Sequence, residues 1–184
     1  MTKRQDLISY IKKHSFKQSG KPVYKLSSGR KSKFYFNLKT TTYSSKGQYL
    51  TGSLVYKKIR ELKLKPEAIG GLTLGADPIA TSTAYHSYGK KIPVDAFVIR
   101  KGPKEHGMKL QIEGSVKAGD KVIIIDDVVT TGQATIKAIK IAEKAKLKII
   151  AVIILVDRCE QNGRENIEKC GYPVYSILSI KDFT

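Results

Sequence analysis

Beyond Pro66 the sequence alternates between short apolar runs and amphipathic segments, and this alternation constrains the fold more than any other feature. The apolar runs predict buried strands at 68–72, 94–99, 122–125, 148–156 and 174–178. Helices are predicted at 133–145, at 164–169 and from Asp77-Pro78, where we expect a capping carboxylate and a proline at the first helical position. Strands that alternate with helices predict an α/β fold, in which a central, mainly parallel sheet is flanked by helices.

The first 65 residues follow a different pattern. Apolar residues at helical spacing within 7–11 predict a short amphipathic helix, which we expect to lie as a lid over the main body. Aromatic residues within 23–37 predict two short strands around a Ser-Ser-Gly-Arg turn. A second helix follows, with Ser44 or Ser45 as its N-cap and Pro66 as its stop.

Length and composition indicate one globular domain over residues 1–184, since 184 residues with 41% hydrophobic content can bury a core of their own. The longest apolar run, 149–156, is much shorter than the roughly 20 residues that cross a membrane, so membrane insertion is not expected. Cys159 and Cys170 cannot form a disulfide framework, and the chain opens without the apolar core of a signal peptide. We therefore expect reduced thiols in a cytoplasmic protein.

The charge is unbalanced, because 34 Lys and Arg against 16 Asp and Glu give a net charge of +18. Residues 1–65 alone hold 17 basic and two acidic side chains. Such a field suits nucleic acid, a polyanionic small substrate or simple solubility, and composition does not separate the three. Lys outnumbers Arg by 28 to six, which weakens the case for base readout, since the bidentate contact to guanine favours Arg.

The stretch 122–135 carries the clearest chemical signal. A buried strand ends in Asp126 and Asp127, and hydroxyls with Gly132 then open a helix, at the edge of the sheet where ligands bind in α/β folds. Amides at a helix N-terminus can hold a phosphate, and carboxylates accept hydrogen bonds from sugar hydroxyls. The stretch therefore favours a phosphorylated ribose; the alternative is that both carboxylates merely cap the strand and the helix. P-loop and dinucleotide glycine patterns are missing from it.

A second stretch, 100–114, contains three glycines, a proline and several charges but no plausible regular element. We interpret it as a long mobile loop, and long loops in compact domains are usually functional.

Three segments of the sequence resemble motifs of a known family. The string Asp126–Thr135 resembles the phosphoribosyl-diphosphate (PRPP) motif of type I phosphoribosyltransferases. Residues 26–37 and 100–107 are similar to the N-terminal signature and the catalytic loop of orotate phosphoribosyltransferases. The resemblance, which covers about 26–158, implies the type I phosphoribosyltransferase fold with a small N-terminal hood. Residues 1–40 and the C-terminal end would form this base-binding hood.

The resemblance implies transfer of the phosphoribosyl group from PRPP to orotate with Mg²⁺, giving orotidine 5′-monophosphate and pyrophosphate. It also implies a homodimer whose catalytic loop acts in the partner's site, with Mg²⁺ held by diphosphate oxygens and waters rather than by metal-ligating residues. Catalysis would depend on Lys101, Lys104, His106, Asp126 and Asp127. The implied PRPP-binding residues are Arg100, Lys101, Lys104, His106, Asp126, Asp127, Val128, Val129, Thr130, Thr131, Gly132, Gln133, Ala134 and Thr135.

Orotate is a planar anion, so its site needs an apolar face and a positive partner. The expected orotate-binding residues are Tyr35, Phe36, Thr130 and Arg158. Arg158 matches the family's orotate-binding arginine, and a guanidinium offers a carboxylate two parallel hydrogen bonds. The alternatives are ordinary strand packing for the two aromatic residues and a surface ion pair of Arg158 with Asp157 or Glu160.

The chain departs from some family members at two positions, where Ser27 and Gly75 stand in place of lysines. The roles of those lysines would pass to backbone amides, Lys25, Lys31 or the loop cations. Two other functions stay open: a phosphoribosyltransferase for another base, and a PRPP-sensing regulator that binds nucleic acid. A catalytic loop argues against the regulator, so nucleic acid is not an expected partner.

Overall fold

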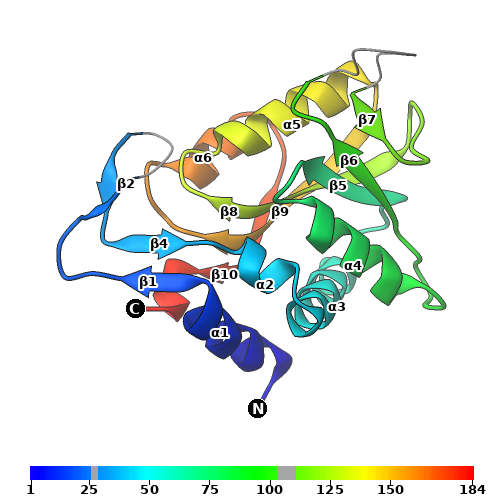
Figure 1. Ribbon diagram of the computed structural model, residues 1–184. Helices are drawn as coiled ribbons and strands as arrows, with labels where there is room; N and C mark the ends of the chain where they lie inside the picture. Colours follow the sequence, from blue (N-terminus) through cyan, green and yellow to red (C-terminus); the bar gives the residue numbers. More distant parts are fainter. Residues whose placement is uncertain (26–28, 103–110) are drawn as a thin grey trace.

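The protein is described by a computed structural model covering residues 1–25, 29–102 and 111–184. Its body is a six-stranded sheet in the order β10-β9-β8-β5-β6-β7, with helices on both faces (Figure 1). The strands are β5 (Ala68–Leu72), β6 (Asp95–Ile99), β7 (Ile112–Glu113), β8 (Lys121–Val129), β9 (Lys148–Asp157) and β10 (Val174–Ser179). Every neighbouring pair is parallel except β6 with β7. The predicted mainly parallel α/β fold is confirmed.

Helices α3 (Ser45–Glu61) and α4 (Asp77–Ser87) cover one face of the sheet, while α5 (Gln133–Lys144) and α6 (Gly163–Glu168) cover the other (Figure 1). Strand β8 has an uninterrupted apolar run because its side chains enter both cores. Ile123 and Ile125 pack on the α3–α4 side, whereas Val122 and Ile124 pack on the α5 side.

The N-terminal segment and the end of the chain form the hood beside this body (Figure 1). Its elements are α1 (Lys3–His14), β1 (Phe16–Gln18), β2 (Tyr24–Lys25), β3 (Lys31–Ser32), β4 (Phe34–Phe36), α2 (Lys39–Thr42) and the 3₁₀ turn η1 (Ile180–Asp182). The ring of Phe16 lies 4.9 Å from that of Phe36 and 5.3 Å from that of Phe183, measured between centroids. Arg4 also pairs with Asp182 at 2.8 Å, so the N-terminal segment and the C-terminal end are in contact.

The N-terminal segment confirms one prediction and corrects another. The amphipathic helix is α1, which packs over the main body with Leu7 and Ile11 fully buried in the core shared with α3. Residues 23–37 form three short strands rather than two, because β4 pairs with β1, an element that the aromatic pattern did not predict. The helix with Ser44 as its N-cap is confirmed.

The sheet also corrects three details. Strand β8 does not end before Asp126 but continues through both carboxylates, because β9 pairs with it as far as Val129. Asp77 is not the cap of α4: Ala76 occupies that position, and Asp77 Oδ2 accepts a hydrogen bond from Thr73 Oγ1 at 2.6 Å. The loop 100–114 contains β7, which pairs with β6; residues 103–110 of this loop lie outside the described residues.

In the described part of the chain, none of the helices combines the length and the apolar character that a membrane span requires.

Candidate functional site

Asp126 and Asp127 lie at the carboxyl end of β8, nearly buried and held by hydrogen bonds. Asp126 Oδ2 accepts a bond of 2.6 Å from Thr135 Oγ1, and its Oδ1 accepts one of 3.0 Å from the amide of Asp127. Asp127 Oδ1 accepts a bond of 2.9 Å from the amide of Val128. These bonds fix both carboxylates at the edge where the helix α5 begins.

Burial changes the acidity of this pair. It raises the pKa of Asp126 to about 7, and the neighbouring charge of Asp127 adds to the effect. The pKa of Asp127 is also raised by burial, although the positive charge of Lys39 opposes the increase. Near neutral pH Asp126 is therefore only partly ionised, and the carboxylate oxygens of the pair can accept hydrogen bonds from sugar hydroxyls.

The turn from β8 into α5 encloses a small cavity of about 120 Å³. It is lined by Asp126, Val128, Val129, Thr130, Thr131, Gly132, Gln133 and Ala134, so eight of the ten residues of the predicted motif surround one space. Gly132 precedes the first turn of α5 with a φ of 80°. The amides at this helix N-terminus can donate to a phosphate, which benefits from the helix dipole.

Helix α6 supports this turn from behind. A Cβ on Gly163 would lie 2.3 Å from the carbonyl oxygen of Thr130, so the helix can approach only through a glycine. Asn166 Nδ2 donates to the carbonyl oxygen of Thr131 at 3.1 Å. Gly163 and Asn166 were not identified from the sequence. The available signal was Gly163, because a glycine directly before the predicted helix 164–169 can mark a close approach of two backbone segments.

Arg158 lies beside the cavity, at the end of β9. Its amide donates to the carbonyl oxygen of Val129 at 3.1 Å. Its Nη2 donates to Ser32 Oγ and to the carbonyl oxygen of Phe34, each at 3.0 Å, and lies 2.8 Å from Glu160 Oε2. Arg158 is buried, so its pair with Glu160 is not the surface ion pair considered as an alternative; Asp157 pairs with Arg164 instead. Ser32 was not identified from the sequence, whereas Glu160 was named there as a possible ion-pair partner of Arg158.

Tyr35 and Phe36 point to opposite sides of β4, as successive strand residues do. Phe36 is only 8% exposed and packs in the hood core, with its ring 5.8 Å from Arg158 Cζ. Tyr35 is 40% exposed and stacks on Tyr24, with 5.7 Å between ring centroids. The two rings therefore cannot form one flat surface together, and ordinary packing accounts for most of what Phe36 does.

The comparisons with known proteins agree with this architecture. The family model for the phosphoribosyl transferase domain matches residues 47–183. The orotate phosphoribosyltransferase of Aquifex aeolicus (strain VF5) is 47% identical over 182 residues, which cover 99% of this chain and 98% of that protein. The chain belongs to the orotate phosphoribosyltransferase family. The enzyme of that name from Rhodopseudomonas palustris (strain TIE-1) is 39% identical over 98% of this chain and 95% of its own length.

Solved structures extend the match to the whole chain. A crystal structure of the Mycobacterium tuberculosis H37Rv orotate phosphoribosyltransferase is 32% identical and has a TM-score of 0.83, with 98% of both chains covered. A second crystal structure of that protein, in complex with PRPP, has a TM-score of 0.78 at 30% identity, again with 98% of both chains covered. The orotate phosphoribosyltransferase fold therefore accounts for hood and body alike.

Two of the loop cations that the family motif marks are described. Arg100 pairs with Glu113 at 3.3 Å, and the carbonyl oxygen of Lys101 accepts a bond of 2.9 Å from Lys137 Nζ on α5. These contacts hold the base of the loop beside β7 and the outer side of α5. Lys104 and His106 lie outside the described residues, as does Ser27.

At Gly75, where some orotate phosphoribosyltransferases carry lysine, the structure leaves little room for a side chain. A Cβ there would lie 2.5 Å from Asp127 Oδ1. Among the described residues, Lys39, at the start of α2, is the cation whose positive charge lowers the pKa of Asp127. Lys39 was not named in the sequence analysis, and it is the candidate that this structure adds for the missing positive charge.

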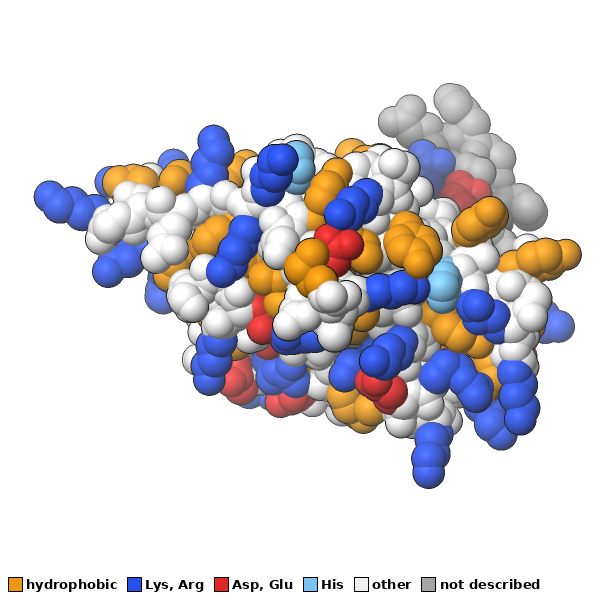
Figure 2. All heavy atoms as spheres, turned by 90° about the horizontal axis from the view of Figure 1, so that it is seen from below, with side chains coloured by type: hydrophobic (Ala, Val, Ile, Leu, Met, Phe, Trp, Pro, Cys, Tyr) orange, Lys and Arg blue, Asp and Glu red, His pale blue; other side chains and the backbone are white. Residues whose placement is uncertain are grey.

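Much of the basic excess lies at the opposite edge of the sheet. Two hollows of about 670 and 620 Å³ share Arg60 and are bounded by the ends of α1, α3 and α4. Their cationic lining residues are Lys3, Arg4, Lys57, Arg60, Lys63, Lys65, Lys90 and Lys91. Figure 2 views the molecule from below, where basic side chains are spread over the surface with few acidic ones between them. None of these cationic residues lines the cavity at the end of β8.

Proposed function

We propose that this protein transfers the 5-phosphoribosyl group from PRPP to orotate, giving orotidine 5′-monophosphate and pyrophosphate in pyrimidine nucleotide synthesis. One observation carries the proposal: a cavity at a helix N-terminus, with the Asp126 carboxylate in its wall and Asp127 next to it in sequence, adjoins a buried arginine whose amide donates a hydrogen bond to the carbonyl oxygen of Val129 on its rim. A phosphorylated ribose and an anionic base need these two environments side by side.

The residues divide the chemistry between them. The amides of 130–135 would hold the 5′-phosphate, and Asp126 and Asp127 would accept hydrogen bonds from the ribose hydroxyls. Breaking the glycosidic bond to the diphosphate moves negative charge onto the leaving group. Arg100, Lys101, Lys104 and His106, as cations of the loop, would stabilise that charge in the transition state, and a closed loop would exclude water.

We further propose Mg²⁺ as the cofactor, with the diphosphate as its main ligand. In the described residues no three or more His, Cys, Asp or Glu side chains gather closely enough to hold a metal. The carboxylates of Asp126 and Asp127 are oxygen donors of the type that Mg²⁺ accepts, beside the position of the ribose. When bound, the ion would neutralise charge on the diphosphate. We propose a cytoplasmic location, consistent with Cys159 and Cys170 as free thiols.

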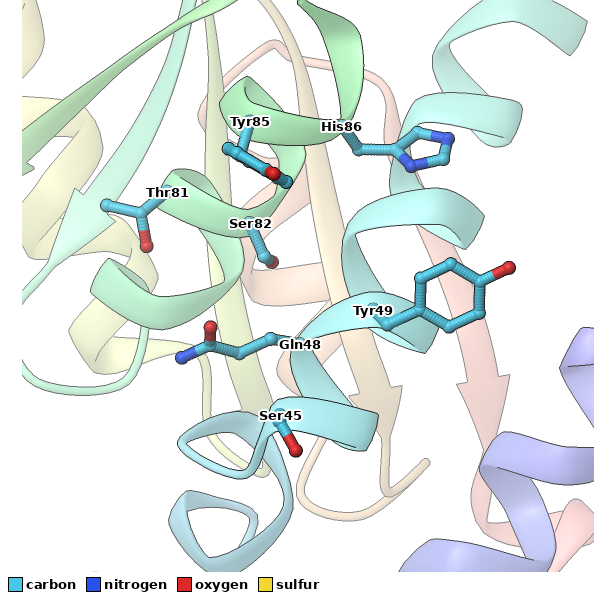
Figure 3. A pocket seen from close by; sticks show the side chains of 7 residues that line it. All are labelled: Ser45, Gln48, Tyr49, Thr81, Ser82, Tyr85 and His86. Carbon is cyan, nitrogen blue, oxygen red and sulfur yellow. The ribbon is translucent and has the colours of Figure 1, made fainter.

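A homodimer is the proposed assembly, with each loop acting in the partner's site. The described loop cations, Arg100 and Lys101, contact β7 and α5 rather than the cavity of 126–134. The face formed by α3 and α4 has a groove of about 530 Å³ with Tyr49 and Tyr85 along it (Figure 3). Tyr49, Tyr85 and Leu74 are exposed. Leu74 belongs to the loop between β5 and α4, which comes close to Asp127 at Gly75. We propose that a second copy covers this surface.

A mixing experiment tests the assembly. Lys104→Ala should disable the loop of one subunit, and Asp126→Asn the cavity of the other. If loops act in trans, mixing the two inactive variants restores about a quarter of the wild-type rate, because half of the dimers are mixed and each has one complete site. No recovery after subunit exchange, or a monomer by light scattering, would contradict the proposed assembly.

A spectrophotometric assay with orotate, PRPP and Mg²⁺ tests the function itself. Orotate absorbance should fall only when PRPP and Mg²⁺ are both present. Arg158→Ala should remove orotate use and leave PRPP binding unchanged, since the guanidinium lies at the base end. A folded protein that transfers phosphoribose to a purine and not to orotate would refute the assignment.

A further inference from the structure

The guanidinium of Arg158 has more acceptors at one nitrogen than it can serve. Nη2 lies 3.0 Å from Ser32 Oγ, 3.0 Å from the carbonyl oxygen of Phe34 and 2.8 Å from Glu160 Oε2. A guanidinium NH₂ carries two hydrogens, so it cannot donate to three oxygens. Ser32 and Phe34 receive the hydrogen bonds, and Glu160 Oε2 keeps only the charge contact.

Two polar atoms of this ion pair are consequently buried without a hydrogen bond. Among the described residues, neither Arg158 Nε nor Glu160 Oε2 has a hydrogen-bonding partner. A buried donor or acceptor in this condition costs free energy. The contact between Nη2 and Oε2, at 2.8 Å, is poorly aligned for a hydrogen bond, and Nε of the guanidinium keeps a hydrogen that a further acceptor could receive.

Glu160 is the member of the cluster that can leave. Its side chain is 27% exposed, whereas that of Arg158 is 5% exposed. Among residues 1–25, 29–102 and 111–184, one well-aligned hydrogen bond holds its carboxylate, the 2.9 Å bond donated by Ser32 Oγ to Oε1. Ser32 Oγ also accepts the amide of Phe34 at 3.1 Å, so Ser32 and Arg158 remain fixed when Glu160 moves.

We propose that Glu160 is a stand-in for the carboxylate of the base, which neutralises Arg158 in the empty site and gives way to a base that carries its own carboxylate. The inference rests on the proposed function. Burial alone would lower the pKa of Arg158, and the charge of Glu160 opposes that effect, so the empty site needs a counter-ion. A base without a carboxylate cannot replace this counter-ion, which makes Glu160 a specificity-determining residue.

The nucleotide products separate this role from simple structural support. Orotidine 5′-monophosphate carries the carboxylate, and uridine 5′-monophosphate is the same molecule without it. Glu160→Gln removes the competing charge but keeps the shape and an oxygen for the Ser32 hydroxyl. Glu165→Gln is the matched control, because Glu165 is exposed on α6 and its loss changes the net charge equally.

Isothermal titration of both nucleotides into the three proteins tests the proposal. Glu160→Gln should bind orotidine 5′-monophosphate about tenfold more tightly than the wild type does, because a like charge is removed beside its carboxylate. Its affinity for uridine 5′-monophosphate, and both affinities of Glu165→Gln, should stay within about twofold of the wild type. Glu160→Asp, which retracts the carboxylate by one methylene, should show a smaller gain and serves if the glutamine variant does not fold.

If folded Glu160→Gln or Glu160→Asp binds orotidine 5′-monophosphate as the wild type does, or more weakly, the proposal is overturned, since Glu160 would then only position Arg158. Equal tightening of both nucleotides would overturn it as well, because the effect would be a general one on the phosphate. If the wild type binds neither nucleotide and consumes no orotate, the proposed function itself fails. If the wild type consumes orotate but the Glu160 variants do not bind orotidine 5′-monophosphate more tightly, only the inference about Glu160 is refuted.

Discussion

The two ends of the candidate site are built in different ways. The end for which we propose ribose-phosphate binding, called the ribose-phosphate end below, is a single stretch, 126–134, whose residues line one cavity; the end around Arg158, for which we propose base binding, is called the base end. The base end joins Ser32 to Arg158, residues 126 positions apart, and depends on the hood lying against β9. The first end is fixed by a turn between two buried elements, whereas the second exists only after the whole chain has folded. Damage to the two ends should therefore be different in kind.

The largest expected effect is at the ribose-phosphate end. Asp126→Asn keeps the size of the side chain but turns one of its two acceptor oxygens into an NH₂ donor, so the side chain can no longer accept hydrogen bonds at both positions, from Thr135 or the Asp127 amide and from the ribose hydroxyls. We expect kcat/KM for PRPP to fall about 100-fold with the fold intact. Initial rates together with a melting curve provide the measurement. A loss of less than about threefold would show that Asp126 has only a structural role.

The pH dependence should also arise at this end. With a pKa of about 7, Asp126 is increasingly protonated below neutrality, so kcat/KM should fall about fivefold between pH 7 and pH 6. Stability should change in the opposite direction. Because the folded pKa lies above the usual value of 3.8, the substrate-free protein loses stability as the pH rises from about 4 to 7. Melting temperatures that rise over this range would contradict the assignment.

Glycines test the packing of the two regions. Gly132 has a φ of 80°, and a Cβ there would lie 2.7 Å from the carbonyl oxygen of Gly163. Gly29, in the hood, has a φ of 81° with nothing within 4 Å of a Cβ. Gly132→Ala should cost about 2–4 kcal/mol of unfolding free energy, whereas Gly29→Ala should cost about 1 kcal/mol from backbone strain alone. Denaturant unfolding measures both, and equal losses would mean that packing against α6 is unimportant.

The base end should be most sensitive at Ser32. Its hydroxyl serves the amide of Phe34, Arg158 Nη2 and Glu160 Oε1 at once. Ser32→Ala should cost about 1–3 kcal/mol, because buried polar groups lose their partner. Ser19→Ala, at a half-buried hood serine whose hydroxyl accepts a long bond of 3.4 Å from the amide of Lys21, should cost less than about 0.5 kcal/mol. A smaller loss at Ser32 than at Ser19 would show that the network contributes nothing to holding the hood.

The contrast between the two ends also explains what the sequence could predict. The strands and helices of the body, and the residues around the phosphate cavity, follow from apolar periodicity and one contiguous motif. Ser32 and Asn166 could not be found in this way, since each acts on a residue that only the folded chain brings near. Glu160 could be named as a possible partner of Arg158, but its burial beside Ser32 could not. The extent of β8 was underestimated for a related reason: pairing with β9, not local composition, decides where the strand ends.

The smallest expected effect is at Lys39, which connects the two ends. It lies on α2, directly after the hood strands, yet its charge lowers the pKa of Asp127 at the ribose-phosphate end. Lys39→Gln should move the acidic limb of the kcat/KM profile to slightly higher pH and change the rate at pH 7 by about twofold, because an exposed cation is largely screened. Added salt should reproduce the shift in the wild type and have little effect on the variant. If Lys39→Gln instead lowers the rate equally at every pH, the lysine contacts the substrate directly, and the hood contributes a cation to the diphosphate.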